Sequence, residues 1–338
     1  MVSNLKICDD PDLLSKIFEA ADKSVFPEFN CHPLYGDFGR ALGAAINFTR
    51  QQHVLTHFAI LEGNEPVLLA PATCDGHSVS MFGSAIQLSI NHSISVKRKK
   101  QAFGKAFQKL EEITNKYKAS NIYIHGGNNM NPPSDIDLAC IKRGARPELR
   151  IHAVVDIEQE EKIIKRDLRK SYRSLVNWGR QNIKTIDINS ENPDRGLFEQ
   201  YSAFHEKIGG VSDYGRTYWD VYWNEIMCDR AELSLGYLDD NHLAVGTLIV
   251  FAAETAYYAS GVYDRDMFDK PLGHFPVFDA ILRASKRGMK IFDLGEIFPV
   301  GMATDKEVQI GFFKRGFTSN YILRTNWNLN TNNKVRSL

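Results

Sequence analysis

Residues 257–296, YYASGVYDRDMFDKPLGHFPVFDAILRASKRGMKIFDLGE, decide the fold, together with FFKRGF at 312–317. A β-rich run leads into a turn that contains Pro271 and Gly273. Apolar residues then recur at helical spacing over 274–287, which predicts an amphipathic helix packed on a sheet. A second short β-rich run follows. The stretch therefore predicts a strand–turn–helix–strand unit.

A weaker copy of this order of elements occurs upstream, between residues 57 and 155. The matching pairs are hairpins turning at Gly63-Asn64 and near Asp240-Asn241, helices at 98–117 and 274–287, short strands at 121–127 and 290–296, and Lys-Arg-Gly at 142–144 and 314–316. A shared order at matching offsets indicates an internal duplication. The alternative is two unrelated α/β units with ordinary turns.

We therefore predict an α/β protein with mixed α+β sheets, built from two lobes packed side by side. The expected boundaries are 1–157 for the first lobe and 158–338 for the second. A basic amphipathic helix is expected at 162–182, and a further helix at 194–207. Near the N-terminus only an amphipathic helix at about 11–22 is evident.

Composition excludes several classes of protein. Lys plus Arg and Asp plus Glu both number 41, so the formal net charge is zero and no global field attracts DNA or an anionic membrane. No window approaches the roughly 18 apolar residues of a transmembrane helix. The five cysteines are scattered, without a C-x-x-C pair or a metal-ligand spacing. Acidic residues near the N-terminus do not fit a signal peptide, so we expect a cytoplasmic protein without a metal site.

The chain resembles the FemAB-type, double GNAT acyltransferases. The matching pieces are DLRKSYRSLVNWGRQNIKTIDI at 167–188, the stretch 263–296, and GFFKRGF at 311–317. The resemblance covers the second lobe by motif and the first lobe by pattern. It implies two tandem GNAT-like lobes that transfer an acyl or aminoacyl group. The long helical arm of some bridge-forming members is missing here, which fits the shorter members.

The resemblance also implies where the acyl donor binds. In a GNAT sheet the donor lies in a gap between two strands, which would here be 256–263, with Gly261, and 290–296. Phosphates of the donor would lie at the turn before the next helix, at Lys270, Gly273 and His274, where free N–H groups favour anions. The Gly-rich signature of CoA-binding GNATs is incomplete here. The donor therefore stays open among acyl-CoA, a thioester of an acyl carrier protein and aminoacyl-tRNA, with no tightly bound cofactor.

Lys314 is the principal catalytic candidate, because the family carries a lysine at the matching Phe-Lys position. A fixed cation can stabilise the negative charge that develops on the carbonyl oxygen during acyl transfer. Phe312, Phe313 and Phe317 are expected to exclude water from it. The alternative is a surface lysine near a turn. Whether Lys142, its first-lobe counterpart, has a role stays open.

Three further residues are candidates for proton transfer. Asp293 and Glu296, in and just after the short strand, could accept a proton from an amine or hydroxyl acceptor. Asp293 could instead cap a loop or pair with an arginine. The hydroxyl of Tyr263 could protonate a leaving group, although a tyrosine in a strand more often belongs to the core.

The acceptor is expected in the cleft between the lobes. Arg169 and Arg173 on the basic helix could contact phosphates of tRNA or of a nucleotide-linked acceptor, unless they form a solvated face. Tyr214 and Tyr218 could line a sugar or peptide, unless they belong to the core. The resemblance makes a nucleotide-linked sugar or a cell-envelope polysaccharide precursor plausible. The alternative function is a catalytically inactive GNAT-fold protein that only binds its ligand.

Overall fold

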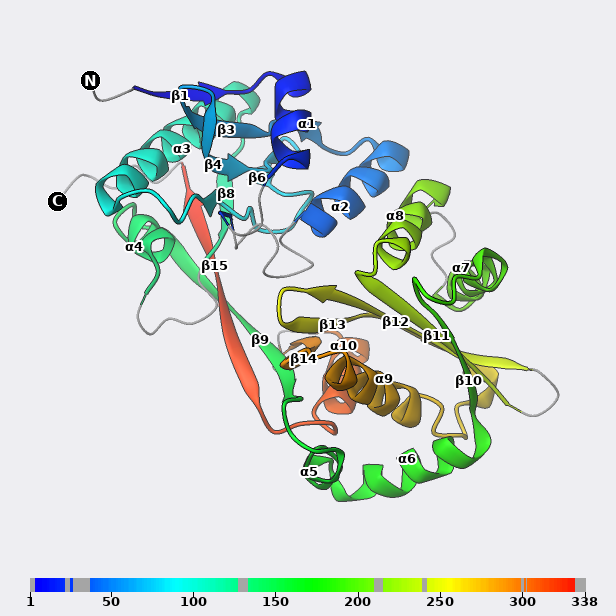
Figure 1. Cartoon of the computed structure of the whole chain (residues 1–338). Coiled ribbons are helices and arrows are strands. Elements are labelled where there is room, and N and C mark those ends of the chain that lie inside the picture. Colours follow the sequence, from blue (N-terminus) through cyan, green and yellow to red (C-terminus); the bar gives the residue numbers. More distant parts are fainter. Residues whose placement is uncertain are drawn as a thin grey trace. The chain divides into compact units, whose positions relative to one another are not determined.

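The structure is a computed structural model that describes residues 4–21, 25–26, 37–126, 133–209, 215–238, 242–298, 301 and 303–331 (Figure 1). It contains two compact units. Unit 1 consists of Met1–Arg150 and Leu323–Leu338, and unit 2 of Ile151–Ile322. The expected lobes are contiguous, whereas unit 1 includes the C-terminal segment of the chain. Within the described ranges, no helix is both long and apolar enough to cross a membrane.

Unit 1 packs its longest helix, α3, against two groups of strands. Phe103, Phe107 and Leu110 of α3 are buried in its core. Its helices are α1 (Pro11–Glu19), α2 (Asp37–Arg50), α3 (Val96–Tyr117) and α4 (Asp135–Ile141). One sheet has the order β1 (Leu5–Cys8), β3 (Phe58–Glu62), β4 (Glu65–Ala70), β7 (Ser89–Ile90). The other strands are β2 (Val54–Leu55), β5 (Thr73–Cys74), β6 (Ser78–Ser80), β8 (Asn121–His125) and β15 (Tyr321–Asn330). The hairpin predicted at Gly63-Asn64 is present between β3 and β4.

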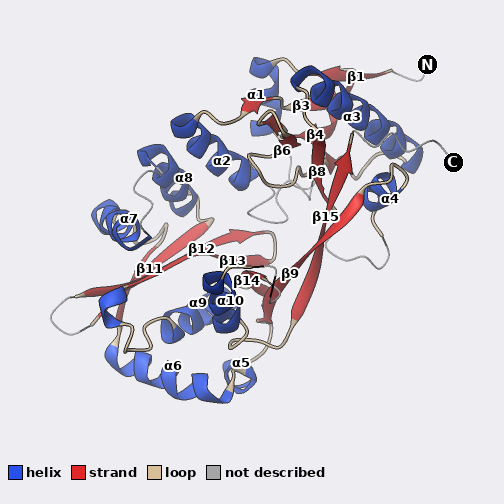
Figure 2. Ribbon diagram, turned by 180° about the vertical axis from the view of Figure 1, so that it is seen from behind, coloured by secondary structure: helices blue, strands red, loops and turns tan. Residues whose placement is uncertain are grey.

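Unit 2 is a sheet with helices on both faces. The strand order is β10 (Lys184–Ile188), β11 (Ala231–Tyr237), β12 (Leu243–Ala252), β13 (Thr255–Tyr263), β14 (Ile291–Ile297), β9 (Arg146–Asp156). Its helices are α5 (Glu161–Asp167), α6 (Lys170–Asn182), α7 (Arg195–Gly209), α8 (Gly215–Met227), α9 (His274–Lys286) and α10 (Asp305–Lys314). Figures 1 and 2 show α7 and α8 on one face and α6 and α9 on the other. The turn predicted at Asp240-Asn241 lies outside the described residues, but β11 and β12 pair antiparallel as expected.

Two sequence predictions in unit 2 need correction. The basic segment 162–182 is not one helix, because Leu168 is extended, with φ −60° and ψ 145°, and separates α5 from α6. The break allows Leu168, which is 2% exposed, to enter the core. The second correction is α10, which the sequence did not predict. Its first turn carries a capping box of Thr304 and Glu307, and the Phe-Lys cluster forms its last turn.

Both halves of the chain share one order of elements, which supports the duplication. In each half a long helix leads to a short strand, a capped helix, a Lys-Arg-Gly turn and a long strand. These long strands are β9 and β15. Strand β15 pairs antiparallel with β8 of unit 1, where Asn326 lies opposite His125. Strand β9 pairs antiparallel with β14 of unit 2, where Val155 lies opposite Phe292. Each sheet is therefore completed by the long strand of the other half.

Candidate active site

The sheet of unit 2 opens between β13 and β14. These parallel strands pair only as far as Tyr257 and Asp293. Strand β13 continues to Tyr263 and keeps its antiparallel pairing with β12. Within the described ranges, no strand pairs with residues 258–263 on the β14 side. We call this gap the strand opening, and one edge of β13 is available there for backbone hydrogen bonds to another molecule.

Strand β14 carries a bulge directly beyond the strand opening. Its pairing with β9 shifts register between Asp293 and Glu296, and Gly295 within the bulge has a φ of +87°, which favours glycine. The Asp293 carboxylate stabilises the bulge by accepting the N–H of Gly295 at 2.7 Å. Its two oxygens lie 3.1 and 3.0 Å from Nδ1 of His152 on β9. Because a carboxylate only accepts, Nδ1 of His152 is the donor.

The last turn of α10 places Lys314 at this bulge, and Figure 1 shows α10 beside β14. Its Nζ donates to the backbone carbonyl of Glu296 at 3.0 Å. A methyl group added to Gly295 would lie 2.9 Å from Nζ and 3.5 Å from the Tyr257 hydroxyl. Burial lowers the pKa of Lys314 below its ordinary value of 10.5, and the charges of Asp293 and Glu296 oppose that effect. The lysine is thus a half-buried amine held at the mouth of the strand opening.

The C-terminal end of α10 is attached to the start of α6. The backbone N–H of Arg169 donates to the carbonyl of Gly316 at 2.8 Å, and its guanidinium donates to the carbonyl of Phe312 at 3.2 Å. The Tyr172 hydroxyl donates to the carbonyl of Phe313 at 3.2 Å. Carbonyls in the last turn of a helix have no partner within the helix, so these bonds cap α10. Arg169, a candidate for acceptor binding, therefore also positions the turn that carries the lysine.

Aromatic rings surround this turn on one side. The ring of Tyr172 meets that of His274 edge to face at 4.4 Å between centroids, and Phe313 meets Phe317 at 5.1 Å. Phe317 is 1% exposed, whereas Phe312 is 52% exposed. Of the three phenylalanines expected to exclude water near the lysine, Phe312 therefore faces solvent instead.

Two tyrosines and two glycines line the β13 side of the strand opening. The hydroxyls of Tyr258 and Tyr263 are 2.5 Å apart, and burial raises the pKa of Tyr263 to about 12. A methyl group at Gly261 would lie 1.6 Å from the Tyr258 hydroxyl, and one at Gly273 would lie 3.0 Å from the Tyr263 ring. A side chain at Gly261 would therefore collide with Tyr258 whether or not a donor binds there, whereas one at Gly273 would require a small shift of the Tyr263 ring.

The turn before α9 reaches the same place. Gly273 caps the helix without any side-chain hydrogen bond to the first turn. His274 is the first helical residue, and burial lowers its pKa below 6.5. Half-buried Lys270 lies three residues before Gly273. The structure thus brings four predicted residues, Gly261, Tyr263, Gly273 and His274, to one side of the strand opening.

Most cations of the basic segment 162–182 make local contacts. Arg173 donates to the carbonyls of Arg166 and Leu168, which end α5. Partners within the described residues are found for four more of its cations: Lys165 with Asn177, Arg166 with Asp167, Arg169 with Phe312, and Arg180 with Glu161. Contacts between such exposed side chains are weak.

Part of the aromatic segment belongs to the core. Tyr214 lies outside the described residues. The half-buried ring of Tyr218 on α8 meets Trp219 at 5.1 Å and Tyr222 at 5.4 Å. Trp219 and Tyr222 are 5% and 4% exposed. These two rings therefore belong to the core, and half-buried Tyr218 stays a candidate for acceptor binding.

Lys142 differs from Lys314. It is exposed and follows the last residue of α4. Its neighbour Arg143 stacks on Phe107, with 3.9 Å between the guanidinium carbon and the ring centroid. Gly144 has a φ of +71°, so the first Lys-Arg-Gly triplet forms a tight turn.

Among the described residues, no group of three or more His, Cys, Asp or Glu side chains could hold a metal ion. Cys8, Cys74 and Cys140 are buried free thiols, and Cys228 is exposed.

No protein-family model matches this sequence, and no curated protein matches it either. Solved structures are similar. FemX has a TM-score of 0.65 at 13% identity, over 97% of this chain and 98% of FemX. L-PGS from Bacillus licheniformis has a TM-score of 0.55 at 13% identity, over 96% of this chain and 93% of its own. A tandem GNAT protein from the clavulanic acid biosynthesis pathway has a TM-score of 0.52 at 11% identity, over 96% and 98%. At such identities the likeness shows the fold, which is a tandem pair of GNAT lobes, as predicted.

Proposed function

Because the chain has the double GNAT fold that FemX shares, we propose that it is an acyltransferase. It moves an acyl or aminoacyl group from a thioester or ester to an amine, or to a hydroxyl. One observation carries the proposal: the half-buried amino group of Lys314 lies at the point where β13 and β14 separate. A fold alone hosts many functions, so the argument rests on this site.

In the proposed reaction the acceptor nitrogen attacks the carbonyl carbon of the donor. A C–N bond forms, a tetrahedral intermediate carries negative charge on the former carbonyl oxygen, and the C–S or C–O bond of the donor breaks. The amine loses one proton and the leaving thiol or alcohol gains one, so the reaction balances. No covalent enzyme intermediate is needed, so catalysis consists of positioning and charge stabilisation.

Lys314 as an ammonium ion stabilises the oxygen that becomes negative. The Glu296 carbonyl orients Nζ at 3.0 Å, and the charge of Asp293 favours the protonated form of the lysine. His152 in turn holds the Asp293 carboxylate in place. Asp293 is 0% exposed, so we assign it a positioning role, and the half-buried Glu296 remains the candidate base for the acceptor.

The donor arm is proposed to lie along the unpaired edge of β13 near Gly261. Its phosphates would then reach the turn at Lys270, Gly273 and His274, where the first N–H groups of α9 have no side-chain cap. Tyr263 lies beside this turn as the candidate acid for the leaving group. Because burial raises its pKa to about 12, it stays protonated at neutral pH.

The fold does not distinguish between donors or acceptors. Three donors fit the proposal: acyl-CoA, a carrier-protein thioester and aminoacyl-tRNA. For the acceptor we propose a nucleotide-linked sugar or a cell-envelope polysaccharide precursor that carries a free amine. Because most cations of α5 and α6 have local partners, tRNA binding through that face has little support.

The test is product formation, detected by mass spectrometry, with each donor and a panel of amine-bearing acceptors. CoA use releases a free thiol, whereas aminoacyl-tRNA use is abolished by ribonuclease. We expect Lys314→Met to fold normally and to lose about 10²–10³-fold in turnover, the usual effect of removing one oxyanion-stabilising group. Lys306→Met, an exposed lysine on the same helix, is the matched control and should keep full activity.

A binding protein without catalysis is the second candidate. It predicts that a donor or acceptor stabilises the chain in a thermal-shift assay while no product forms with any pair. Normal turnover of Lys314→Met would remove the lysine from the mechanism.

A further inference from the structure

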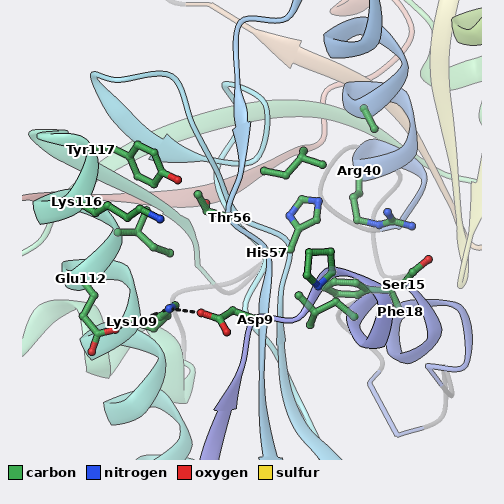
Figure 3. Close-up of a pocket in the computed structure, with 15 residues that line it drawn as sticks. Asp9, Ser15, Phe18, Arg40, Thr56, His57, Lys109, Glu112, Lys116 and Tyr117 are labelled. Atoms are coloured by element: carbon green, nitrogen blue, oxygen red, sulfur yellow. Dashed lines mark hydrogen bonds and ion pairs between the residues drawn. The ribbon is translucent and has the colours of Figure 1, made fainter.

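Unit 1 contains a pocket that the proposed acyl transfer does not use. It has a volume of about 500 Å³ and lies among α1, α2, the C-terminal half of α3 and the segment that enters β3 (Figure 3). That volume is typical of small-molecule sites. Every residue that lines it belongs to unit 1, so the pocket is separate from Lys314 and the strand opening.

Positive charge predominates around the pocket. Its lining includes three cations, Arg40, Lys109 and Lys116, and two carboxylates, Asp9 and Glu112. Lys109 and Asp9 neutralise each other through an ion pair of 2.6 Å. Within the described residues, no carboxylate lies within ion-pair distance of Lys116. Lys116 is therefore the cation that an anion in the pocket would approach.

One wall of the pocket is apolar. Leu14 and Phe18 of α1 are both 4% exposed and line the pocket together with Ile113 of α3. The guanidinium of Arg40 lies 5.4 Å from the centre of the Phe18 ring, which holds it at the edge of this apolar wall. A ligand that fills the space gains by burying hydrocarbon there.

Beside Lys116 the pocket offers a hydroxyl group without a partner. The buried Oγ1 of Thr56 has no hydrogen-bond partner among the described residues. Figure 3 shows Thr56 between Lys116, which extends from α3, and His57, with Arg40 beyond it. A buried hydroxyl normally has a partner, so an unpaired one at the wall of a cavity indicates where a polar ligand group would lie.

We propose that this pocket binds a small amphiphilic anion. Its carboxylate or phosphate lies beside Lys116 and accepts from the Thr56 hydroxyl, and its hydrocarbon part packs on Leu14 and Phe18. The inference is independent of acyl transfer, because no residue of the strand opening takes part in it.

The experiment measures binding to the full-length chain by isothermal titration calorimetry. The probes are octanoate, octyl phosphate and the uncharged analogue octanamide. We expect at least one of the two anions to bind with a stoichiometry of one and octanamide to bind at least about tenfold more weakly, as expected for loss of a charge-assisted hydrogen bond. The anion that binds with the higher affinity shows whether the site prefers a carboxylate or a phosphate.

Variants of the pocket provide the second arm. Ala44 lines the pocket, and Ala44→Phe should abolish binding by filling it. Lys116→Gln changes an exposed side chain, so the variant should fold normally. It should lower the affinity for the anion by about threefold, as expected for the loss of a partly solvated cation. Lys100→Gln, on the same helix but outside the pocket, is the matched control and should bind like the original chain.

Lys314→Met should also bind the anion normally, which separates this inference from the proposed function. The proposal is overturned if neither anion binds, if octanamide binds as tightly as the tighter-binding anion, or if Ala44→Phe leaves binding intact. Circular dichroism of each variant establishes that it has folded.

Discussion

Lys314 owes its charge state to its surroundings. Burial lowers its pKa, and the negative charge of Asp293 opposes this, so removing that charge should lower the pKa further. We predict that Asp293→Asn shifts the pH at which Lys314 becomes reactive to lower values. The measurement is the pH dependence of acetic anhydride labelling of Lys314, followed by mass spectrometry, because only the neutral amine reacts.

Lys306 serves as an internal control in this labelling experiment, since it is exposed on the same helix. In the unchanged protein Lys314 should begin to react at a lower pH than an ordinary lysine. Asp266→Asn, an exposed carboxylate in the same unit, should leave the profile of Lys314 unchanged. Identical profiles for the original chain and Asp293→Asn would show that the carboxylate does not act on the lysine.

His57 couples the stability of the protein to pH. Burial, with a smaller contribution from the charge of Arg40, lowers its pKa from 6.5 to about 4. The unfolded chain therefore binds a proton near pH 6.5 that the folded chain binds only near pH 4. The stability that His57 confers is complete above pH 6.5 and falls through this window, by on the order of 3 kcal/mol at about 1.4 kcal/mol per pH unit.

The measurement is urea unfolding at several pH values between 7 and 4. Carboxylates contribute to the pH dependence as well, so the quantity to compare is the difference between the original chain and His57→Gln. The variant should lose less stability than the original chain over this range, whereas exposed His77→Gln should follow it. Parallel curves for the original chain and His57→Gln would contradict the prediction.

At the scale of residues, local sequence was enough for some groups and not for others. Lys314 and Asp293 are candidates from sequence because each belongs to a short motif that the family resemblance covers. His152 was not, because it reaches Asp293 only through the pairing of β9 with β14, across 141 positions of sequence. Tyr257, whose hydroxyl lies near Gly295, is not among the sequence candidates, since alternation along a strand does not say which face borders an opening. Asp293 itself was expected to face the groove and is instead fully buried against His152.

At the scale of elements, α4 and α10 occupy matching places in the two halves and begin alike. Ser134 and Asp137 form a capping box on α4, as Thr304 and Glu307 do on α10. We predict that Ser134→Ala and Thr304→Ala each lower the free energy of unfolding by about 0.5–2 kcal/mol, because each removes the acceptor of a helix N–H. Urea unfolding measures both effects. Ser93→Ala, an exposed serine next to a loop, is the control, and a loss of equal size there would refute the capping argument.

Helix α10 was not predicted because the apolar residues of its sequence, DKEVQIGFFK, show only weak helical periodicity. It contains Gly311 and two adjacent phenylalanines, and both features favour other structures when the sequence is taken alone. Its helical form comes from its two ends: the capping box at the start, and Arg169 and Tyr172 at the end. The split of the basic segment into α5 and α6 has the same origin, because the break at Leu168 is set by the core and by the bond from Arg169 to Gly316. Tertiary contacts decided both cases.

At the scale of the whole molecule, the exchange of long strands could not be derived from sequence. The sequence of β15 predicts a strand without saying which strand is its neighbour. The expected boundaries, 1–157 and 158–338, kept each half contiguous for that reason. The duplication of the two halves was predictable because it depends only on the order of elements.

The exchange makes each unit depend on residues from the other half of the chain. Trp327 of β15 is 3% exposed in the core of unit 1, where its Nε1 donates to Asp137 at 2.8 Å. We predict that Trp327→Ala costs about 3–5 kcal/mol, the usual effect of truncating a buried Trp, and that the loss appears in unit 1 although the change lies near the C-terminus. Native-state hydrogen exchange, resolved by mass spectrometry, should show faster exchange in α3, α4 and β8 than in β11–β13.

Val155→Ala is the reciprocal variant, because Val155 of β9 is 6% exposed in the core of unit 2. Its smaller truncation should speed exchange in β14 and α9 while α3 and β8 keep their protection. The pair of variants thus tests strand membership directly, since each should loosen the unit whose core its strand completes. If Trp327→Ala loosened unit 2 and Val155→Ala loosened unit 1, each long strand would belong to the sheet of its own half, and the exchange of strands would be wrong.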